Sequence, residues 1–296
     1  MVPHSGRQFH NGCQRGLPLV GGRPPVDGVT RPVRLTRSFY IMQTEVTQAE
    51  WTEVMKDEVP NTSWFAACGP QCPVVRITLW DTLVFANLRG ALDGFEPCYE
   101  LVGCTFDPVG HFWCEKAAAV GPDCSGYRIP SEAEWELAAG ATSDKCMLTG
   151  PAYVYDDRTL CCSDLHFSYA WCRYHCEIHY EGCIPQDSGD QKCCGVHPVA
   201  QLAPNAFGLF DVIGNAEEFV ATEKQDNKLP PPPLEVDPGQ LAVIAGTVMD
   251  KGGTFKMEPP FLSPSVGLGR PTDSVNILTV AVPVGFRLVR TVPAGE

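Results

Sequence analysis

The chain of 296 residues has no uninterrupted apolar run near the roughly 18 residues that a membrane-spanning helix needs. It has no internal repeat and no coiled-coil heptads, which excludes solenoid and fibrous architectures. With 44% hydrophobic residues it can bury a full core. The sequence therefore predicts a globular protein without a membrane span.

Basic residues are scarce. The 22 Lys and Arg residues against 35 Asp and Glu residues give a formal charge of −13. A phosphate backbone would on average be repelled by this charge, which makes nucleic acid a poor partner. An acidic surface fits a solvated protein and a cation-binding protein equally well.

Common catalytic motifs are also missing, because no GxSxG, HExxH or P-loop sequence occurs. Ser131 precedes Glu134 at capping-box spacing, so it is predicted to begin a helix rather than to act as a nucleophile. Glu132, Glu134 and Glu136 are expected on the exposed face of that helix, where they need no chemical role.

Cysteine is abundant, with 15 residues scattered from Cys13 to Cys194 and none after. This usage predicts disulfides and an oxidising compartment: secreted, periplasmic or cell surface. The odd count leaves one cysteine unpaired, unless its partner lies outside the chain. The segment 1–20 contains no apolar core of a signal peptide, so we expect that a leader is missing or that the start is misassigned.

The segment from about 146 to 194 is a cysteine-rich insertion without a sustained period. Cys172 with Cys176, and His175 with His179, have four-residue spacing that could form a zinc site on a helix. Disulfides with surface histidines are the favoured alternative, because cysteines are scattered through the rest of the chain as well.

Local patterns predict three capped helices and several strands. Thr47 and Thr78 stand three residues before acids, as Ser131 does, and each begins an apolar helical period. Strands are expected at 33–45, in the PVVRI sequence from residue 73, and in the closing VGFRLVR. The proline-rich stretch at about 228–239 is expected to be an exposed loop.

Six of these segments occur in an order that resembles the formylglycine-generating enzyme, or sulfatase-modifying factor, family. They are FYIMQTEVTQAEW, PVVRITLWDTLVFANL, GYRIPSEAEWELAAGA, PNAFGLFDVIGNAEEF, KGGTF and GFRLVR. The resemblance covers essentially the whole chain, 1–296. It implies a single α+β domain, loop-rich and disulfide-rich, with a fold related to C-type lectins.

Active members of that family oxidise a substrate cysteine to formylglycine with copper, bound by a cysteine pair after the Gly-Gly-Ser-aromatic turn. A thiolate is the soft ligand that Cu(I) prefers. In this chain Met257 and Leu262 occupy the two cysteine positions. The resemblance therefore implies a member without that chemistry, for which copper is not expected.

The resemblance also implies a calcium site at Asp211, Gly214, Ala216 and Glu218, the middle two through backbone carbonyls. Carboxylate and carbonyl oxygens are the ligands that Ca²⁺ takes in such a loop. The alternative is that Asp211 and Glu218 accept hydrogen bonds from N–H groups of the turn. A second calcium site of the family cannot be aligned, because the cysteine-rich insertion occupies its region.

These observations favour a non-catalytic, calcium-stabilised module, a pseudoenzyme that binds a protein or glycan partner outside the cell. The alternative is a metal-dependent oxidase of the sulfatase-modifying type that uses non-standard ligands.

Overall fold

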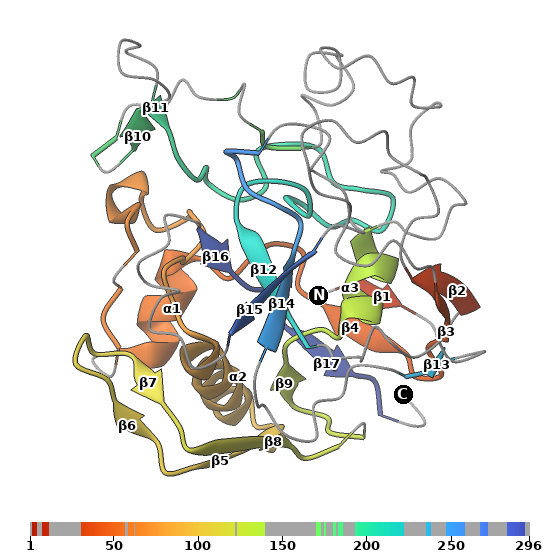
Figure 1. Cartoon of the computed structure of the whole chain (residues 1–296). Coiled ribbons are helices and arrows are strands. Elements are labelled where there is room, and N and C mark those ends of the chain that lie inside the picture. Colours follow the sequence, from red (N-terminus) through yellow and green to blue (C-terminus); the bar gives the residue numbers. More distant parts are fainter. Residues whose placement is uncertain are drawn as a thin grey trace.

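The computed structural model combines three helices with short strands (Figure 1). It describes residues 2–4, 8–11, 31–56, 59–61, 63–121, 123–139, 170–172, 175, 180–181, 183–185, 193–221, 235–237, 247–257, 267–271 and 283–293. Most of the cysteine-rich insertion and of the proline-rich stretch lies outside these ranges. The mixed content of helix and strand confirms the α+β prediction.

Two four-stranded sheets form the centre. The first has the order β1-β4-β17-β9 and the second the order β15-β14-β12-β16. The first contains β1 (Val2–His4), β4 (Phe39–Ile41), β17 (Val289–Thr291) and β9 (Tyr127–Arg128). The second contains β15 (Gly267–Pro271), β14 (Thr247–Lys251), β12 (Glu217–Val220) and β16 (Val284–Gly285).

Smaller ladders surround these sheets. A three-stranded sheet joins β13 (Glu235–Val236), β3 (Arg31–Arg34) and β2 (Gln8–Asn11). Two-stranded ladders pair β5 (Tyr99–Val102) with β8 (Lys116–Ala119), β6 (Thr105–Phe106) with β7 (Phe112–Trp113), and β10 (Ile184–Pro185) with β11 (Cys193–Cys194). The described part of the cysteine-rich insertion thus includes a short antiparallel ladder where only loops were expected.

The helices are α1 (Gln48–Met55), α2 (Leu79–Leu92) and α3 (Glu132–Ala139), and a 3-10 turn covers Ala66–Cys68. The capping boxes predicted at Thr47 and Thr78 are both present, with reciprocal hydrogen bonds to Glu50 and Asp81. Ser131 Oγ likewise accepts from the Glu134 N–H at 3.2 Å, while the Ser131 N–H donates to the Glu134 carboxylate. All three helix starts are confirmed.

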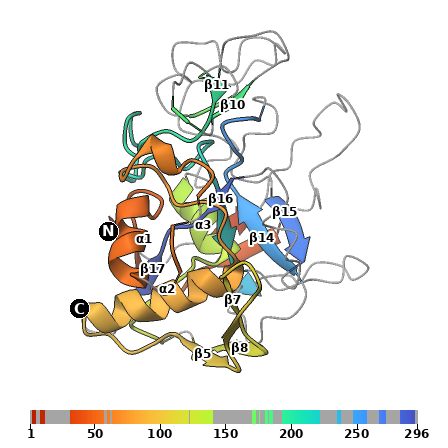
Figure 2. The same ribbon diagram turned by 90° about the vertical axis from the view of Figure 1, so that its left-hand side faces the viewer.

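Aromatic packing joins α1 and α2 to the end of the chain. The Trp51 ring stacks on Phe85 with centroids 5.5 Å apart, and Phe286 meets both rings edge-on. These side chains belong to one buried cluster that also receives residues of β5, β8 and the Cys98–Cys124 disulfide. Figure 2 shows α2 lying along the β5–β8 ribbon.

The strand predicted from PVVRI is wrong. Only Pro73 forms an isolated bridge, to Thr47, and Arg76 has φ 64°. A left-handed residue breaks the alternation of an extended chain. The predicted strand at 33–45 is interrupted after Arg34 and resumes as β4, and the proline-rich stretch contributes β13 to a sheet.

The closing VGFRLVR also differs from one continuous strand. It forms β16 in the second sheet and β17 in the first, with residues 286–288 crossing between them. Arg287 therefore lies at the junction of the two sheets. Among the described residues, no helix is long and apolar enough to cross a bilayer.

Outside the cysteine-rich insertion, three disulfides of the described residues join Cys68 to Cys72, Cys98 to Cys124, and Cys104 to Cys114. They confirm that the chain is disulfide-rich. Two of them fix the ribbon 98–124, whose strands share one antiparallel register from Tyr99↔Ala119 to Phe106↔Phe112.

Replacing Asp81 is expected to destabilise the fold more than replacing Glu50, although both side chains complete a capping box. The Asp81 carboxylate also accepts from the Phe112 N–H at 2.7 Å and contacts the buried His111 Nδ1 at 2.6 Å. Asp81→Ala should lower the free energy of unfolding by about 3 kcal/mol, and Glu50→Ala by about 1 kcal/mol. Urea unfolding of both variants measures this. Equal losses would show that the contacts to the ribbon contribute nothing.

Candidate functional site

The turn 211–216 carries three of the four predicted calcium positions, Asp211, Gly214 and Ala216, while Glu218 follows in β12. Asp211, Gly214 and Asn215 all have positive φ, of 55°, 81° and 56°. A Cβ atom on Gly214 would lie 1.7 Å from the Trp171 carbonyl oxygen, so only glycine fits against that segment. The Gly214 N–H donates to the Gly252 carbonyl at 2.9 Å. The turn is thus held between residues 170–172 and the Gly252–Gly253 turn.

Asp211 is buried, and each of its carboxylate oxygens accepts a hydrogen bond. The Trp171 indole N–H donates to Oδ1 at 2.9 Å, and the Ala200 N–H donates to Oδ2 at 2.7 Å. Burial raises the pKa of Asp211, and these two donors oppose the rise. Neither donor belongs to the turn 211–216, so Asp211 joins the turn to the segments at Trp171 and Ala200 and does not accept from the turn's own N–H groups.

Glu218 forms the main ion pair of the site. The Arg287 Nε and Nη2 atoms donate to its two oxygens, both at 2.7 Å, and the Trp135 indole N–H donates at 2.7 Å. The other Arg287 donors reach the carbonyls of Met42, Gln43 and Phe210 at 3.0–3.1 Å. Burial alone would lower the pKa of Arg287, but the facing Glu218 raises it.

Glu45 is the acid that sequence reasoning missed. Its side chain is fully buried, and neither carboxylate oxygen has a hydrogen-bond partner. Burial raises the pKa of Glu45 well above its usual range, the charges of Asp211 and Glu218 raise it further, and Arg287 opposes them. Three acids thus share one guanidinium, a buried excess of two negative charges when all are ionised.

This charge excess and the bare Glu45 oxygens are features that a divalent cation would satisfy. Among the described residues, however, no three His, Cys, Asp or Glu side chains converge closely enough to hold a metal ion by themselves. A calcium ion here would therefore also need the Gly214 and Ala216 carbonyls. The residues fit a cation in charge and donor type, and calcium stays a prediction.

The Gly252–Gly253 turn leads to the first of the two replaced cysteine positions. Both glycines have positive φ, of 90° and 71°. Met257 is partly buried, and its N–H donates to the Thr254 carbonyl at 3.0 Å. Leu262 lies outside the described residues. The structure thus describes the first of the two positions, where Met257 has a thioether in place of the thiolate that the resemblance implies.

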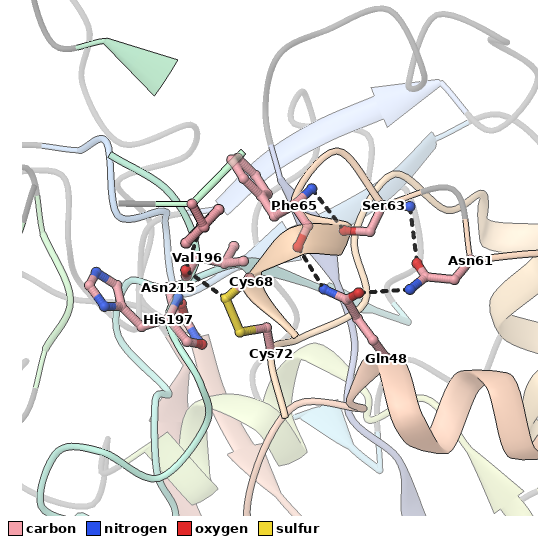
Figure 3. The surroundings of a disulfide bond; sticks show 10 residues. Gln48, Asn61, Ser63, Phe65, Cys68, Cys72, Val196, His197 and Asn215 are labelled. Atoms are coloured by element: carbon pink, nitrogen blue, oxygen red, sulfur yellow. Dashed lines mark hydrogen bonds between the residues drawn. A yellow bond between two sulfur atoms is a disulfide. The ribbon is translucent and has the colours of Figure 1, made fainter. Parts of the chain in front are cut away.

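A separate apolar cluster lies beside this turn. It contains Phe65, Cys72, Val75, Cys194, Val196, Ala216 and Phe255. The Phe65 and Phe255 rings meet edge-on, with centroids 5.6 Å apart. Figure 3 shows the Cys68–Cys72 disulfide beside Asn215 and His197. Asn215 Oδ1 accepts from the His197 N–H at 2.8 Å, which ties the motif to this cluster.

The described part of the cysteine-rich insertion supports disulfides over zinc. Cys172, Cys183 and Cys194 are all disulfide-bonded. His175 Nδ1 accepts from the Cys172 N–H at 3.2 Å, and the His197 ring stacks on Trp171 at 3.7 Å. Burial, assisted by His175, lowers the pKa of His197 to about 4. Cys176 and His179 lie outside the described residues.

The acids of α3 do not form an exposed face, which corrects the prediction. Glu134 and Glu136 are buried, and Glu134 binds Arg128 through two contacts of 2.7 Å. Lys251 Nζ lies 2.7 Å from Glu136 and 2.6 Å from Glu132. The pKa of Lys251 is raised by these acids in spite of burial. Their role is to hold α3 against the strand that leads into Gly252–Gly253.

Glu45→Gln should stabilise the metal-free protein at neutral pH. As pH rises above about 4.3, an unfolded glutamate ionises while the buried one retains its proton, so wild-type stability falls. Glutamine cannot ionise, so the variant should exceed the wild type by about 1 kcal/mol or more at pH 7, with a gap that closes towards pH 4.

Denaturant unfolding in EDTA at both pH values measures the gap, with the exposed Glu53→Gln as control. A variant less stable than the wild type at pH 7 would contradict the assignment of Glu45 as an uncompensated acid.

Comparison with known proteins identifies the scaffold. Residues 11–292 match the model of the sulfatase-modifying factor enzyme 1-like domain. The chain is 30% identical over 218 residues to a formylglycine-generating enzyme of Thermomonospora curvata, covering 71% of this chain and 63% of that one. It is 29% identical over 185 residues to the chaperone protein LppX of Paenibacillus barcinonensis, covering 61% of each. The chain thus spans about six tenths of these relatives.

Solved structures show the same fold. Variable protein 1 of Treponema denticola has a TM-score of 0.67 at 20% identity, covering 98% of this chain and 94% of that one. PvdO from Pseudomonas aeruginosa has a TM-score of 0.59 at 18% identity, with the same coverage. The family match extends over the second sheet, the first sheet except β1, the three described helices and the turn 211–216. The chain is a member of the sulfatase-modifying factor enzyme 1-like domain family.

Proposed function

We propose that this protein is a secreted or cell-surface member of the family that binds a protein partner and does not make formylglycine. The observation that carries the proposal is Met257 at the first of the two copper-binding positions. A thioether cannot provide the anionic sulfur on which tight Cu(I) binding and oxygen chemistry depend. The buried site around Glu218 is retained because it holds the fold together.

A partner-binding role is supported by the exposed side chains of α2 and the ribbon 98–124. Among the residues whose side-chain exposure the structure describes, the exposed large apolar ones lie between residues 88 and 120; they are Leu88, Leu92, Val102, Phe106, Val109, Trp113 and Val120. The exposed charges close to them in sequence are five acids against one base: Asp93, Glu96, Glu100, Glu115 and Asp123 against Lys116. We infer a partner that presents an apolar segment with lysines or arginines.

The absence of formylglycine chemistry is tested by loading the protein with copper and measuring oxygen consumption with a cysteine-containing sulfatase peptide. Wild type should bind no stoichiometric Cu(I) and consume no oxygen above background. Met257→Cys combined with Leu262→Cys restores both thiolates and should recover Cu(I) binding. Turnover by the copper-loaded wild type would establish the oxidase alternative.

The partner surface is tested with two synthetic peptides, one alternating leucine and lysine and one alternating leucine and glutamate. Phe106→Ser with Trp113→Ser should weaken binding of the lysine peptide at least tenfold, without changing net charge. Ala66→Ser with Ala67→Ser, at exposed positions elsewhere, should leave it unchanged. Equal binding of the lysine peptide by both variants, or tight binding of the glutamate peptide, would contradict the assignment of this surface as the partner-binding site. Binding of a glycan array instead would favour the glycan alternative.

Calcium remains part of the proposal because of the charge excess at Glu45, Asp211 and Glu218. When bound, the ion would neutralise that excess and hold the turn 211–216. Excess CaCl₂ should therefore raise the melting temperature relative to EDTA by several degrees, and Asp211→Asn should reduce the rise. Magnesium serves as the control for a general salt effect. Identical melting in EDTA and CaCl₂ would eliminate calcium from this site.

A further inference from the structure

The Cys68–Cys72 disulfide closes a surface turn beside the place where the family's first cysteine is replaced. Cys72 belongs to the same buried cluster as Phe255, and Cys68 packs against it. Met257 follows Phe255 by two residues. Figure 3 shows the disulfide between the Gln48 side of the cluster and the Val196–His197 segment. The disulfide and the segment that leads to Met257 therefore pack into the same cluster.

The two cysteine residues of this disulfide differ in exposure to solvent. Cys72 is fully buried, whereas Cys68 is partly exposed. The neighbouring Ala67, Pro70 and Gln71 are exposed. An incoming thiolate therefore reaches Cys68 first, and the buried Cys72 is the leaving sulfur.

Backbone contacts hold the turn independently of the S–S bond. The N–H groups of Gln48 and Ala49, in the first turn of α1, donate to the carbonyls of Cys72 and Pro70, both at 2.9 Å. The Val199 N–H donates to the Gln71 carbonyl, also at 2.9 Å. The disulfide spans only four residues in sequence, against 26 for Cys98–Cys124, so its contribution to chain entropy is the smaller. Opening it leaves the turn in place.

Two cations lie over aromatic rings of the same cluster. The Arg76 guanidinium is 5.6 Å from the Trp64 ring centroid, and Lys256 Nζ is 6.0 Å from that of Phe255. Trp64 packs against the cluster and Phe255 is part of it. Both cations thus lie at the cluster against which Cys68 packs.

We propose that Cys68–Cys72 is an exchangeable disulfide that forms a reversible mixed disulfide with the thiol of a cysteine-bearing peptide. The incoming thiolate forms a bond to Cys68 Sγ, the Cys68–Cys72 bond breaks, and Cys72 leaves as a thiolate. Attack by Cys72 on the mixed disulfide reverses the step. A second thiol of the same peptide would instead release it oxidised by two electrons and leave both cysteines reduced. This exchange goes beyond the proposed partner binding and does not depend on it.

Glutathione is a suitable probe, because it needs no knowledge of the partner. The folded, non-reduced protein is incubated with graded glutathione, trapped with N-ethylmaleimide, and mapped by mass spectrometry. We expect glutathione on Cys68 and N-ethylmaleimide on Cys72 at a concentration at least tenfold below that which opens Cys104–Cys114. The latter is a stringent control, because Cys104 is exposed. Preferential reaction at Cys104, or no adduct on Cys68 when other disulfides open, would overturn the proposal.

A pair of double variants separates exchange from a structural role. Cys68→Ser with Cys72→Ser should retain the wild-type melting temperature within a few degrees and lose the fast-reacting disulfide. Cys104→Ser with Cys114→Ser should keep the fast reaction at Cys68. If the first variant fails to fold, the Cys68–Cys72 bond is structural and the proposal is wrong.

Discussion

The rest of the structure depends on the bidentate ion pair between Arg287 and Glu218, which joins the two four-stranded sheets. Glu218 is in β12 of the second sheet, whereas Arg287 lies in the crossing from β16 to β17. The same guanidinium binds the carbonyls of Met42 and Gln43, which follow β4 of the first sheet. Because these groups are buried, removing one partner would leave the other charge uncompensated.

This arrangement gives the signature motif a structural meaning that does not require catalysis. Asp211 fixes Trp171 and Ala200, Asn215 fixes His197, and Glu218 fixes Arg287. These contacts join the motif to segments between 11 and 69 residues away in the sequence. A chain with methionine at residue 257 can therefore keep the motif, since the fold still depends on it. The excess acid at Glu45 is the part of this arrangement that a proton or a cation would neutralise.

The sequence predicted those features whose cause is local. The three capping boxes depend on residues three apart, and all were correct. The PVVRI strand failed because composition does not reveal that Arg76 takes a left-handed conformation. The acids of α3 looked solvated because Arg128 and the distant Lys251 neutralise them only in the folded chain. No pattern in the neighbouring sequence marks Glu45 as a buried acid. The GFRLVR segment and the motif containing Glu218 were both recognised, but the contact between Arg287 and Glu218 was not predicted.

The most direct test of the account is a double-mutant cycle on the joint between the sheets, using Glu218→Gln, Arg287→Met and their combination in urea unfolding. Each single variant should lose about 3–5 kcal/mol, because it strands a buried charge or donor set. The double variant should lose less than the sum by at least about 1 kcal/mol. Losses below about 1 kcal/mol that add without coupling, as for the partly exposed pair Arg89–Asp93, would contradict the claim that this ion pair holds the fold together.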